Sequence, residues 1–360
     1  MSKRILVTGI ASYWGGRLAQ ALEGFEEVEA IIGLDSVEPR RELERTEFVK
    51  VTNQHSLLAR IVRAAEIDTV IDTRLTVNSV TAPPRSAHDN NVIGTMNIVT
   101  ACAGPDTPVR KFIFKSSTHY YGAEQDDPAF FQEAMRRPHP PRTPLEREIG
   151  EAEGAVAEFA EKHPDIEVTV LRCANVLGPD VDTAFTRMFG LPMVPMVLGF
   201  DPRLQFVHED DVVYALEHSA FNETPGIYNV AADGVLALSE AISLLGKRPA
   251  PVLPPWGAGL LAGPLRSLGF KVPSELLNLL RFGRGVDNRR FQEAGFKYSH
   301  TSREAVAKFG HYLRVDPVMR GVDQEYTYER EVEEFLRWSP HVRRELPAEG
   351  VEADHEPLGI

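Results

Sequence analysis

Glycine residues follow the first apolar run of the chain, in the segment VTGIASYWGG at residues 7–16. Glycine at the first of these positions permits a tight turn between a strand and a helix. The first turn of such a helix offers unpaired N–H groups to a pyrophosphate. The middle position holds a serine instead of glycine, whose hydroxyl either displaces the phosphates or donates to them. We expect a dinucleotide to contact Gly9, Ser12, Tyr13, Trp14 and Gly15.

An acidic residue, Asp35, follows the second apolar run, Ala30–Leu34. An aspartate at the end of the second strand can accept hydrogen bonds from both hydroxyls of an adenosine ribose, and it would repel a 2′-phosphate. NAD is therefore favoured over NADP as the cofactor, although Arg40 and Arg41 lie nearby in the sequence. The alternative interpretation of Asp35 is an ordinary aspartate in a surface loop.

Short apolar runs alternate with helix-like stretches through the first half of the chain. The runs predict strands at Ile5–Thr8, Ala30–Leu34, Phe48–Val51, Thr69–Ile71, Lys111–Lys115 and Val168–Leu171. Helices are predicted around Leu18–Leu22, His55–Ala65, Val92–Ala103 and Leu145–Lys162. This alternation implies parallel βαβ units. The predicted fold is α/β, a Rossmann-type doubly wound parallel sheet with a smaller C-terminal substrate-binding region.

Prolines interrupt this pattern after about residue 178. We expect a Rossmann NAD(P)-binding domain at 1–178, a substrate-binding region interleaved with it at 179–310, and a C-terminal extension at 311–360. Core strands are expected to recur within 204–232. Residues 345–356 carry five acidic residues and no lysine or arginine, which predicts a flexible acidic end.

Composition excludes several classes of protein. The 360 residues include 39 Lys and Arg against 52 Asp and Glu, a formal charge of −13, which argues against a nucleic-acid partner. The sequence has no apolar segment long enough to predict a transmembrane helix. Two cysteines, Cys102 and Cys173, make no disulfide framework, so we expect a reducing, cytoplasmic location. The residues show no metal-ligand spacing, and no metal site is predicted.

Several blocks together resemble the extended short-chain dehydrogenase/reductases, specifically the NAD-dependent epimerase/dehydratase group that acts on sugar nucleotides. The resemblance covers most of residues 3–310 and rests on the order and spacing of the blocks. Besides the glycine turn and Asp35, they are Asn91–Thr95, Ser116–Gly122, Leu171–Pro179 and Phe206–Val212.

The resemblance implies roles for individual residues. Gly9 and Gly15 would face the pyrophosphate, and Asn91 would lie on the helix behind the site. Ser117 matches the active-site serine of the family, which polarises the reacting oxygen through a hydrogen bond. Asn175 matches a residue that contacts the substrate.

The resemblance also implies a substrate and an assembly. The substrate would be a small molecule, a nucleotide sugar or another phosphorylated ligand. Arg203 lies one residue out of register with an arginine that binds its diphosphate, and a bidentate arginine suits such a group. The helices at Val92–Ala103 and Leu145–Lys162 are the pair that related proteins pack across a two-fold axis, so a homodimer is expected by analogy.

The chain departs from the family at its acid–base unit, Tyr-x-x-x-Lys. Leu145 stands in the tyrosine position and Ile149 in the lysine position, and neither side chain can transfer a proton. Arg74 follows the fourth strand where the family has small residues, so it either contacts the pyrophosphate or fills the space for the cofactor. If the rest of the site is intact, restoring both residues should raise turnover.

Three interpretations remain open. An enzyme could use a relocated acid, for which the candidates are His119, Tyr120, Tyr121, His139, Glu146 and Glu148. Among these, His119 and Tyr120 adjoin Ser117 at the carboxyl end of a strand, where α/β sites form, and these three are the predicted catalytic residues. In the second interpretation, the protein binds a dinucleotide without turnover, as a sensor or a partner subunit. In the third, the cofactor site is vestigial and the fold is a scaffold for protein contacts.

The apolar segment Trp256–Phe282 predicts packing over the substrate site. Its alternative interpretation is a pocket for a lipid-like ligand, with Arg281 and Arg284 meeting a phosphate.

Overall fold

A computed structural model describes residues 2–51, 55–77, 87–104, 106–252, 274–319 and 335 of the chain. It divides into a unit of residues 1–324 and a C-terminal unit of residues 325–360, of which only Phe335 is described. The acidic end and most of the apolar segment Trp256–Phe282 therefore lie outside the described residues. No helix in the described ranges is long and apolar enough to cross a membrane.

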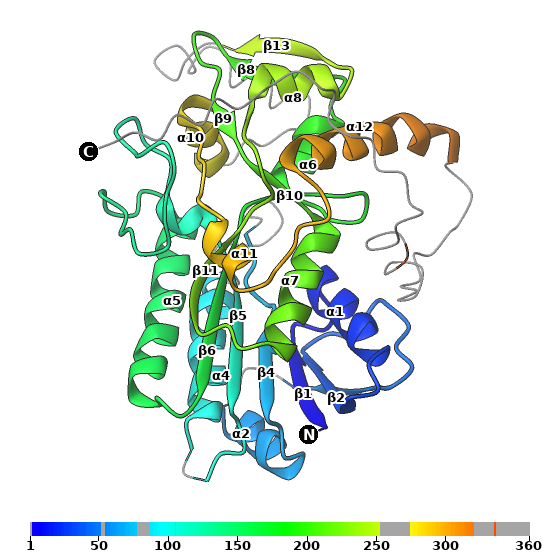
Figure 1. The fold of residues 1–360 in the computed structure, drawn as a ribbon, viewed down its shortest axis with the longest axis vertical. Helices are drawn as coiled ribbons and strands as arrows, with labels where there is room; N and C mark the ends of the chain where they lie inside the picture. The colour runs from blue at the N-terminus through cyan, green and yellow to red at the C-terminus, as the bar shows by residue number, and fades with distance from the viewer. Residues whose placement is uncertain are drawn as a thin grey trace. The chain divides into compact units, whose positions relative to one another are not determined.

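A seven-stranded parallel sheet forms the centre of the first unit (Figure 1). Its strands are β1 (Lys3–Thr8), β2 (Val28–Asp35), β3 (Thr46–Lys50), β4 (Thr69–Asp72), β5 (Lys111–Ser117), β6 (Glu167–Cys173) and β11 (Gly226–Val230). Their order in the sheet is β11-β6-β5-β4-β1-β2-β3. The strands β2 and β3 follow on one side of β1, and β4, β5 and β6 follow on the other side. The strand order thus changes direction between β1 and β4, which is where open α/β sheets bind ligands. The predicted α/β fold is confirmed.

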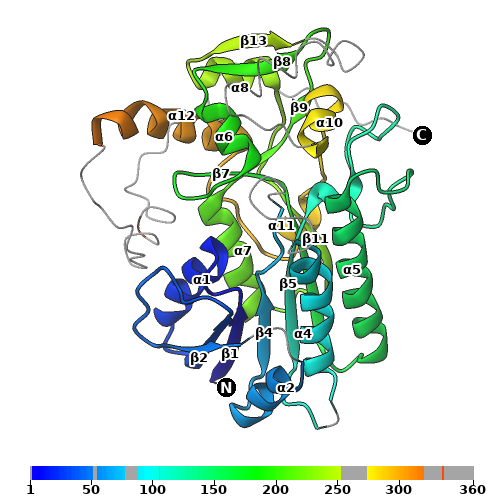
Figure 2. The same ribbon diagram turned by 180° about the vertical axis from the view of Figure 1, so that it is seen from behind.

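Helices cover both faces of the sheet. They are α1 (Tyr13–Glu23), α2 (His55–Ala64), α4 (Gly94–Cys102), α5 (Pro144–Lys162) and α7 (Glu209–Phe221). Helices α1 and α7 pack against each other on the face nearer the viewer in Figure 1, and α2, α4 and α5 cover the other face (Figure 2). The long helix α5 begins cleanly because the Thr143 hydroxyl accepts from the N–H of Glu146, 3.2 Å away, and Pro144 needs no partner.

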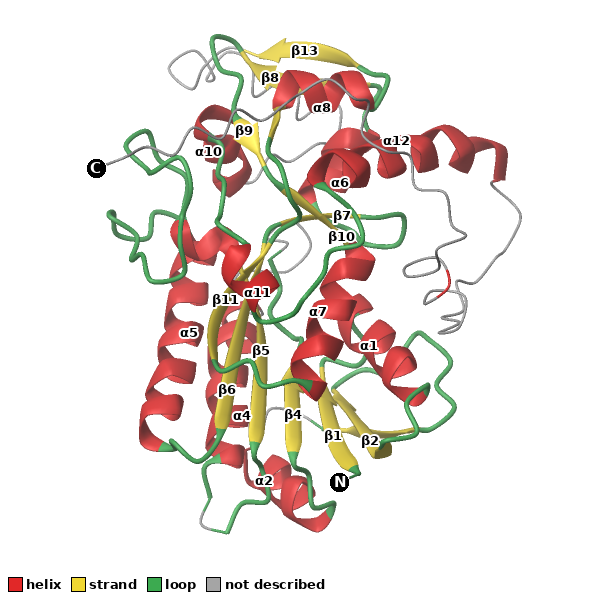
Figure 3. Cartoon of the chain, viewed as in Figure 1, coloured by secondary structure: helices red, strands yellow, loops and turns green. Residues whose placement is uncertain are grey.

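Smaller elements lie beyond the carboxyl ends of the strands (Figure 3). They are β7 (Asn175–Leu177), α6 (Ala184–Gly190), β8 (Met193–Val197), β9 (Arg203–Leu204), β10 (Phe206–His208), β12 (Leu236–Ala237), α8 (Leu238–Leu244), β13 (Arg248–Val252), α10 (Ser274–Phe282), α11 (Arg289–Glu293) and α12 (Ser302–Met319). An apolar cluster that includes Phe189, Phe206 and Leu279 holds many of them together. The chain thus builds a second core over the edge of the sheet where a ligand would bind.

A buried ion pair joins α5 to the sheet. The Arg172 guanidinium of β6 donates to both oxygens of Glu153, with the shortest distance, Nη2 to Oε2, at 2.6 Å. Arg172 also donates to the Tyr121 hydroxyl at 2.8 Å. Ser116 donates to the same carboxylate. Two buried charges are tolerated here because each has a full set of partners.

Candidate functional site

The glycine turn between β1 and α1 has the geometry that the sequence indicates. Gly9 has a φ of +80°, and a Cβ there would lie 2.7 Å from Cγ of Arg74. A Cβ on Gly15 would overlap the Gly9 carbonyl, so the helix could not approach the strand. Ser12 caps α1, and its hydroxyl accepts from the Gly15 N–H at 3.1 Å. The amides of Tyr13 and Trp14, at the first two helical positions, have no partner within the helix and remain suited to a phosphate.

Asp35 lies at the carboxyl end of β2, beside a cavity of about 190 Å³. One carboxylate oxygen accepts from the Ala11 N–H at 3.0 Å, and the other accepts from the Ser36 N–H at 2.7 Å. The carboxylate therefore ties the end of β2 to the glycine turn. The cavity is lined by Thr8, Leu34, Asp35, Ser36, Val51, Leu58, Arg74, Asn90 and Ile98.

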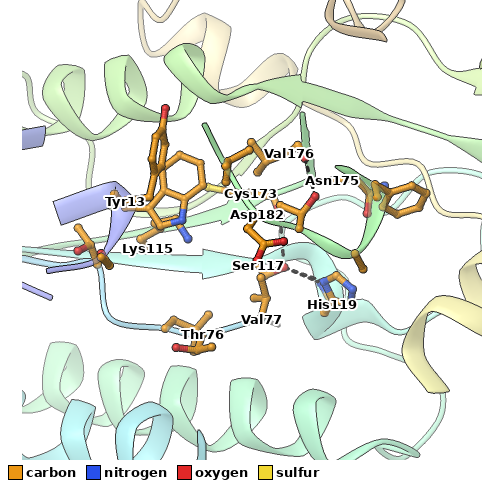
Figure 4. Close-up of a pocket in the computed structure, with 18 of the residues that line it drawn as sticks. Tyr13, Thr76, Val77, Lys115, Ser117, His119, Cys173, Asn175, Val176 and Asp182 are labelled. Atoms are coloured by element: carbon orange, nitrogen blue, oxygen red, sulfur yellow. Dashed lines mark hydrogen bonds between the residues drawn. The ribbon is translucent and has the colours of Figure 1, made fainter. Parts of the chain in front are cut away.

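A larger cavity of about 300 Å³ opens over the carboxyl ends of β5 and β6 (Figure 4). Residues from the glycine turn, the loop after β4, both strand ends, α6 and α10 line it. Its polar side chains include Lys115, Ser117, His119, Asn175 and Asp182, set among Val77, Val176, Phe185, Leu276 and Leu279. A mostly apolar cavity with a few convergent polar groups is typical of a small-molecule site.

Arg74 lines both cavities. Its Nε lies 3.1 Å from Oδ1 of the buried Asp72, and the Thr8 hydroxyl donates to the same oxygen at 2.8 Å. Its guanidinium lies against Gly94, where a Cβ would be 2.8 Å from Nη1. A cation is therefore fixed at the junction between the two cavities, directly over the glycine turn.

Ser117 and His119 form a hydrogen-bonded pair in the larger cavity. Oγ of Ser117 and Nδ1 of His119 are 2.9 Å apart, and a dashed line in Figure 4 marks this contact. Burial lowers the pKa of His119 well below its usual value, and the nearby Arg284 guanidinium adds to this effect. The imidazole is therefore neutral near pH 7, a form that can accept a proton.

Lys115 and Cys173 also line this cavity, and the sequence-based predictions overlooked both. Nζ of Lys115 lies 4.7 Å from the centroid of the Trp14 ring. Burial lowers the pKa of Lys115, whereas it raises the pKa of the Cys173 thiol to about 11. Strand periodicity offered a signal for Lys115. Residues two apart on a strand project from the same face, and Lys115 stands two residues before Ser117 on β5.

Tyr120 lies elsewhere. Its ring packs against the core and is covered by the Arg172 guanidinium, whose Cζ is 3.6 Å from the ring centroid. It does not line the cavity. The 3₁₀ turn at Thr118–Tyr121 directs His119 into the cavity and Tyr120 toward α5 and the core. Tyr120 is therefore not retained as a candidate acid.

The other relocated-acid candidates also have structural partners or lie outside the cavity. The Tyr121 hydroxyl donates to Oδ1 of Asn229 at 2.8 Å. Glu146 accepts from Arg137 at 2.8 Å, and Glu148 accepts from Asn91 at 2.9 Å. These residues and His139 are absent from the cavity lining.

Asn91 and Asn175 differ in their positions. The Asn91 side chain is buried and anchors the loop after β4, because its Oδ1 accepts from the Thr76 N–H at 2.8 Å. Asn175 lines the larger cavity and donates to the Gln205 carbonyl at 2.9 Å. Within the described ranges its buried Oδ1 has no hydrogen-bond partner, which leaves an acceptor for a ligand.

Arg203 lines a third cavity, of about 280 Å³. Arg281 and Arg284 line it too, together with Phe130, Phe131 and Phe282. In the part of the chain that the structure describes, Nε of Arg281 and Nη2 of Arg284 are buried without hydrogen-bond partners. Asp127 and Asp201 also contribute to the lining. Three guanidinium groups converging on one cavity favour an anionic ligand.

Leu145 and Ile149 are sealed into the core. Leu145 is 5% exposed and Ile149 is 0% exposed, and both belong to the apolar cluster that contains Leu75. Neither lines the larger cavity. The departure from the family pattern therefore lies in the apolar core, because these positions hold no polar group facing a ligand.

No group of three or more His, Cys, Asp or Glu among the described residues could hold a metal ion.

Comparison with known proteins gives consistent results. The NAD dependent epimerase/dehydratase family model matches residues 5–231. An uncharacterized protein of Mycobacterium tuberculosis (strain H37Rv) is 34% identical over 325 residues, covering 87% of this chain and 84% of the relative.

Solved structures share the fold at lower identity. UDP-glucose 4-epimerase of Thermotoga maritima with UDP-glucose has a TM-score of 0.66 and 20% identity, covering 86% of this chain and 98% of that one. UDP-glucuronic acid 4-epimerase of Bacillus cereus in complex with NAD has a TM-score of 0.65 and 16% identity, covering 87% and 96%.

Proposed function

Because the chain belongs to the NAD dependent epimerase/dehydratase family, we propose that it binds NAD and catalyses redox or epimerisation chemistry through a Ser117–His119 pair. The observation that carries this proposal is the 2.9 Å contact between Oγ of Ser117 and Nδ1 of His119. It lies in a cavity that also reaches the glycine turn. The pair would take over the proton transfer that the family assigns to its absent tyrosine and lysine.

The residues present fit NAD. The cavity beside Asp35 suits an adenosine, and the larger cavity suits the nicotinamide half with a substrate. Arg74 lies at the junction, where a pyrophosphate would cross, and its positive charge complements that group. We propose that Gly9, the first turn of α1 and Arg74 hold the pyrophosphate, and that Asp35 holds the ribose. NAD, when bound, accepts or returns a hydride.

The chain's own contribution is proton transfer. In the tautomer with its proton on Nε2, neutral His119 accepts the Ser117 hydroxyl proton at Nδ1. Ser117 can then accept a proton from a substrate hydroxyl as that carbon loses hydride, and return it in the reverse step. Ser117 thus makes the contact with the reacting oxygen, and His119 holds the proton only transiently, because burial and Arg284 disfavour the imidazolium.

The cavity lined by Arg203, Arg281 and Arg284 supports a phosphorylated substrate, such as a nucleotide sugar. Nε of Arg281 and Nη2 of Arg284, which lack hydrogen-bond partners among the described residues, would pair with a diphosphate. Phe130 and Phe282 offer apolar surface for a base. Helix α10 contributes Leu276 and Leu279 to the larger cavity and Arg281 and Phe282 to this one.

Removing the carboxylate of Asp35 should weaken NAD binding. The expected loss for Asp35→Ala is about 1–2 kcal/mol, since hydrogen bonds to a charged group are lost. Isothermal titration calorimetry measures the change. Asp165→Ala, in an exposed turn between α5 and β6, is the matched control and should leave the affinity unchanged. Equal affinity in Asp35→Ala and the control would show that Asp35 does not hold the ribose.

Removing either member of the proton-transfer pair should abolish most turnover. Ser117→Ala and His119→Ala should each lower kcat by about 10²–10⁴, and the double variant should be no slower, because the residues act as one unit. Tyr120→Phe is the control and should keep full activity. Conversion of UDP-glucose, UDP-glucuronic acid or dTDP-glucose provides the assay, followed by chromatography of the sugar nucleotides and by NADH absorbance, because an epimerase returns its hydride and accumulates no NADH. A fully active His119→Ala would remove the histidine from the mechanism.

A second candidate function is dinucleotide binding without turnover. The apolar side chains of Leu145 and Ile149 favour it, because they replace the family's acid–base group. Under this alternative, NAD binds but no sugar nucleotide reduces it.

We also propose a cytoplasmic homodimer. Ile93 and Met96 are 43% and 47% exposed beside and on α4, and a Cβ on Gly150 or Gly154 of α5 would meet nothing within 4 Å. Such apolar and flat surfaces favour helix packing against a second copy. Met96→Lys should shift the protein toward monomer in sedimentation velocity, whereas a dimer unaffected by this change would have its interface elsewhere.

Both cysteines are free and buried, as suits a reducing compartment.

A further inference from the structure

Lys115 is a buried lysine that the proposed proton transfer does not use. It is 2% exposed and lines the larger cavity beside Ser117 and His119. Across the described ranges, its Nζ has neither a hydrogen bond nor an ion pair, and its contact is with the Trp14 ring face. The Asp72 carboxylate and the Cys173 thiol act on it electrostatically, but neither forms an ion pair with it. A buried cation without a paired anion is costly, so its presence in a cavity calls for an explanation.

Lys111 of the same strand shows how this fold satisfies a structural lysine. Its Nζ donates to the Ser219 carbonyl at 2.9 Å and lies 3.1 Å from Oε1 of Glu167. Lys111 does not line the cavity. The two lysines share one strand and one face, yet only Lys111 has protein partners in the described structure. Lys115 is therefore placed for a ligand.

We propose that Lys115 is a nucleophile that captures an aldehyde or ketone group of a cavity ligand as an imine. The amine nitrogen forms a bond to the carbonyl carbon, and the carbonyl electron pair moves to oxygen, which takes up a proton. The resulting carbinolamine loses its hydroxyl as water while nitrogen gives up its remaining proton. The net reaction joins amine and carbonyl and releases one water, with no change of oxidation state.

The surroundings of Lys115 suit this chemistry. Desolvation by the cavity walls lowers the pKa of Lys115 and outweighs the Cys173 thiol and the Asp72 carboxylate, which act in the opposite direction. The fraction of neutral amine at a given pH is therefore raised. The Trp14 ring, 4.7 Å from Nζ, restrains the side chain without forming a salt bridge that would keep it protonated.

The Ser117–His119 pair can carry the protons that imine formation requires. Ser117 and Lys115 stand two residues apart on β5 and line the same cavity. Neutral His119 can accept the proton that the ammonium must lose before it attacks, and can supply the proton that leaves with the hydroxyl. This reactivity needs no NAD, so it stands apart from the proposed cofactor chemistry.

Trapping with borohydride tests the proposal on the full chain without added NAD. The protein is incubated with limiting benzaldehyde at neutral pH, reduced with sodium borohydride, digested and analysed by mass spectrometry. Adduct at Lys115 should exceed that at the exposed Lys162 by at least about tenfold, because desolvation leaves a larger fraction of the Lys115 amine neutral. The yield at Lys115 should also rise to its plateau at lower pH than the yield at Lys162.

Two variants separate reactivity from folding. Lys115→Arg should lose the adduct and Lys111→Met should keep it, with circular dichroism confirming that each variant is folded. Labelling of Lys162 equal to or above that of Lys115 in the wild-type protein would overturn the proposal, as would identical pH profiles. Because NAD is absent, failure here leaves the proposed NAD function untouched, and failure to bind NAD leaves this result untouched.

Discussion

Replacing Arg172 with methionine should destabilise the protein by about 3–5 kcal/mol, the cost of leaving a buried charge without its partner. The Glu153 carboxylate would keep only its bond from Ser116, and the Tyr121 hydroxyl would lose a donor. Denaturation in urea, followed by circular dichroism, measures the change in the free energy of unfolding.

Two comparisons make this expectation specific. Lys162→Met, which breaks an exposed ion pair with Glu158 on the same helix, should cost less than about 1 kcal/mol. The double variant Arg172→Met/Glu153→Met should be more stable than Arg172→Met alone, because it removes both charges. If the single and double variants unfold at the same denaturant concentration, the cost comes from lost packing and the charge pair is unimportant.

Restoring the family's acid–base residues by Leu145→Tyr and Ile149→Lys should fail to raise turnover and should destabilise the fold by at least about 3 kcal/mol. The sequence alone leads to the opposite expectation. The structure leads us to expect the reverse, because Ile149 is 0% exposed within an apolar cluster and its position does not line the cavity. A lysine there would bury its charge against Leu75 and its neighbours.

Urea denaturation and the same turnover assay together check this expectation. Ile149→Met is the control of similar volume, and it should cost less than about 1.5 kcal/mol. A stable double variant with new activity would show that α5 can turn this face toward the ligand.

Periodicity located the strands because each is a short apolar run buried in a parallel sheet. The ends of the strands and helices were predicted less accurately than their positions in the chain. The expected Thr69–Ile71 extends to Asp72, whose buried carboxylate is polar in sequence but paired with Thr8 and Arg74. The expected helix at Val92–Ala103 begins earlier, as a π-turn at Asp89–Ile93 that precedes α4. When a buried polar side chain has its hydrogen-bond partner far away in the sequence, as Asp72 has in Thr8, the local sequence does not indicate that the side chain is buried.

The candidate site was only partly visible in the sequence. Ser117 and His119 could be found because they directly follow a strand and fall at the edge where sites form. Tyr120 follows the same strand, but the 3₁₀ turn directs its side chain away from the cavity, toward Arg172. The contact of Lys115 with Trp14 joins residues about a hundred positions apart, so no spacing rule could predict it.

NAD titration of the wild-type protein tests the central claim most directly. Isothermal titration calorimetry on the stripped protein should give micromolar affinity for NAD and weaker affinity for NADP, because Asp35 would repel a 2′-phosphate. AMP alone should bind more weakly than NAD, since it reaches only the cavity beside Asp35. Absence of NAD binding up to millimolar concentration would contradict the account, and would show that Arg74 closes the junction between the two cavities.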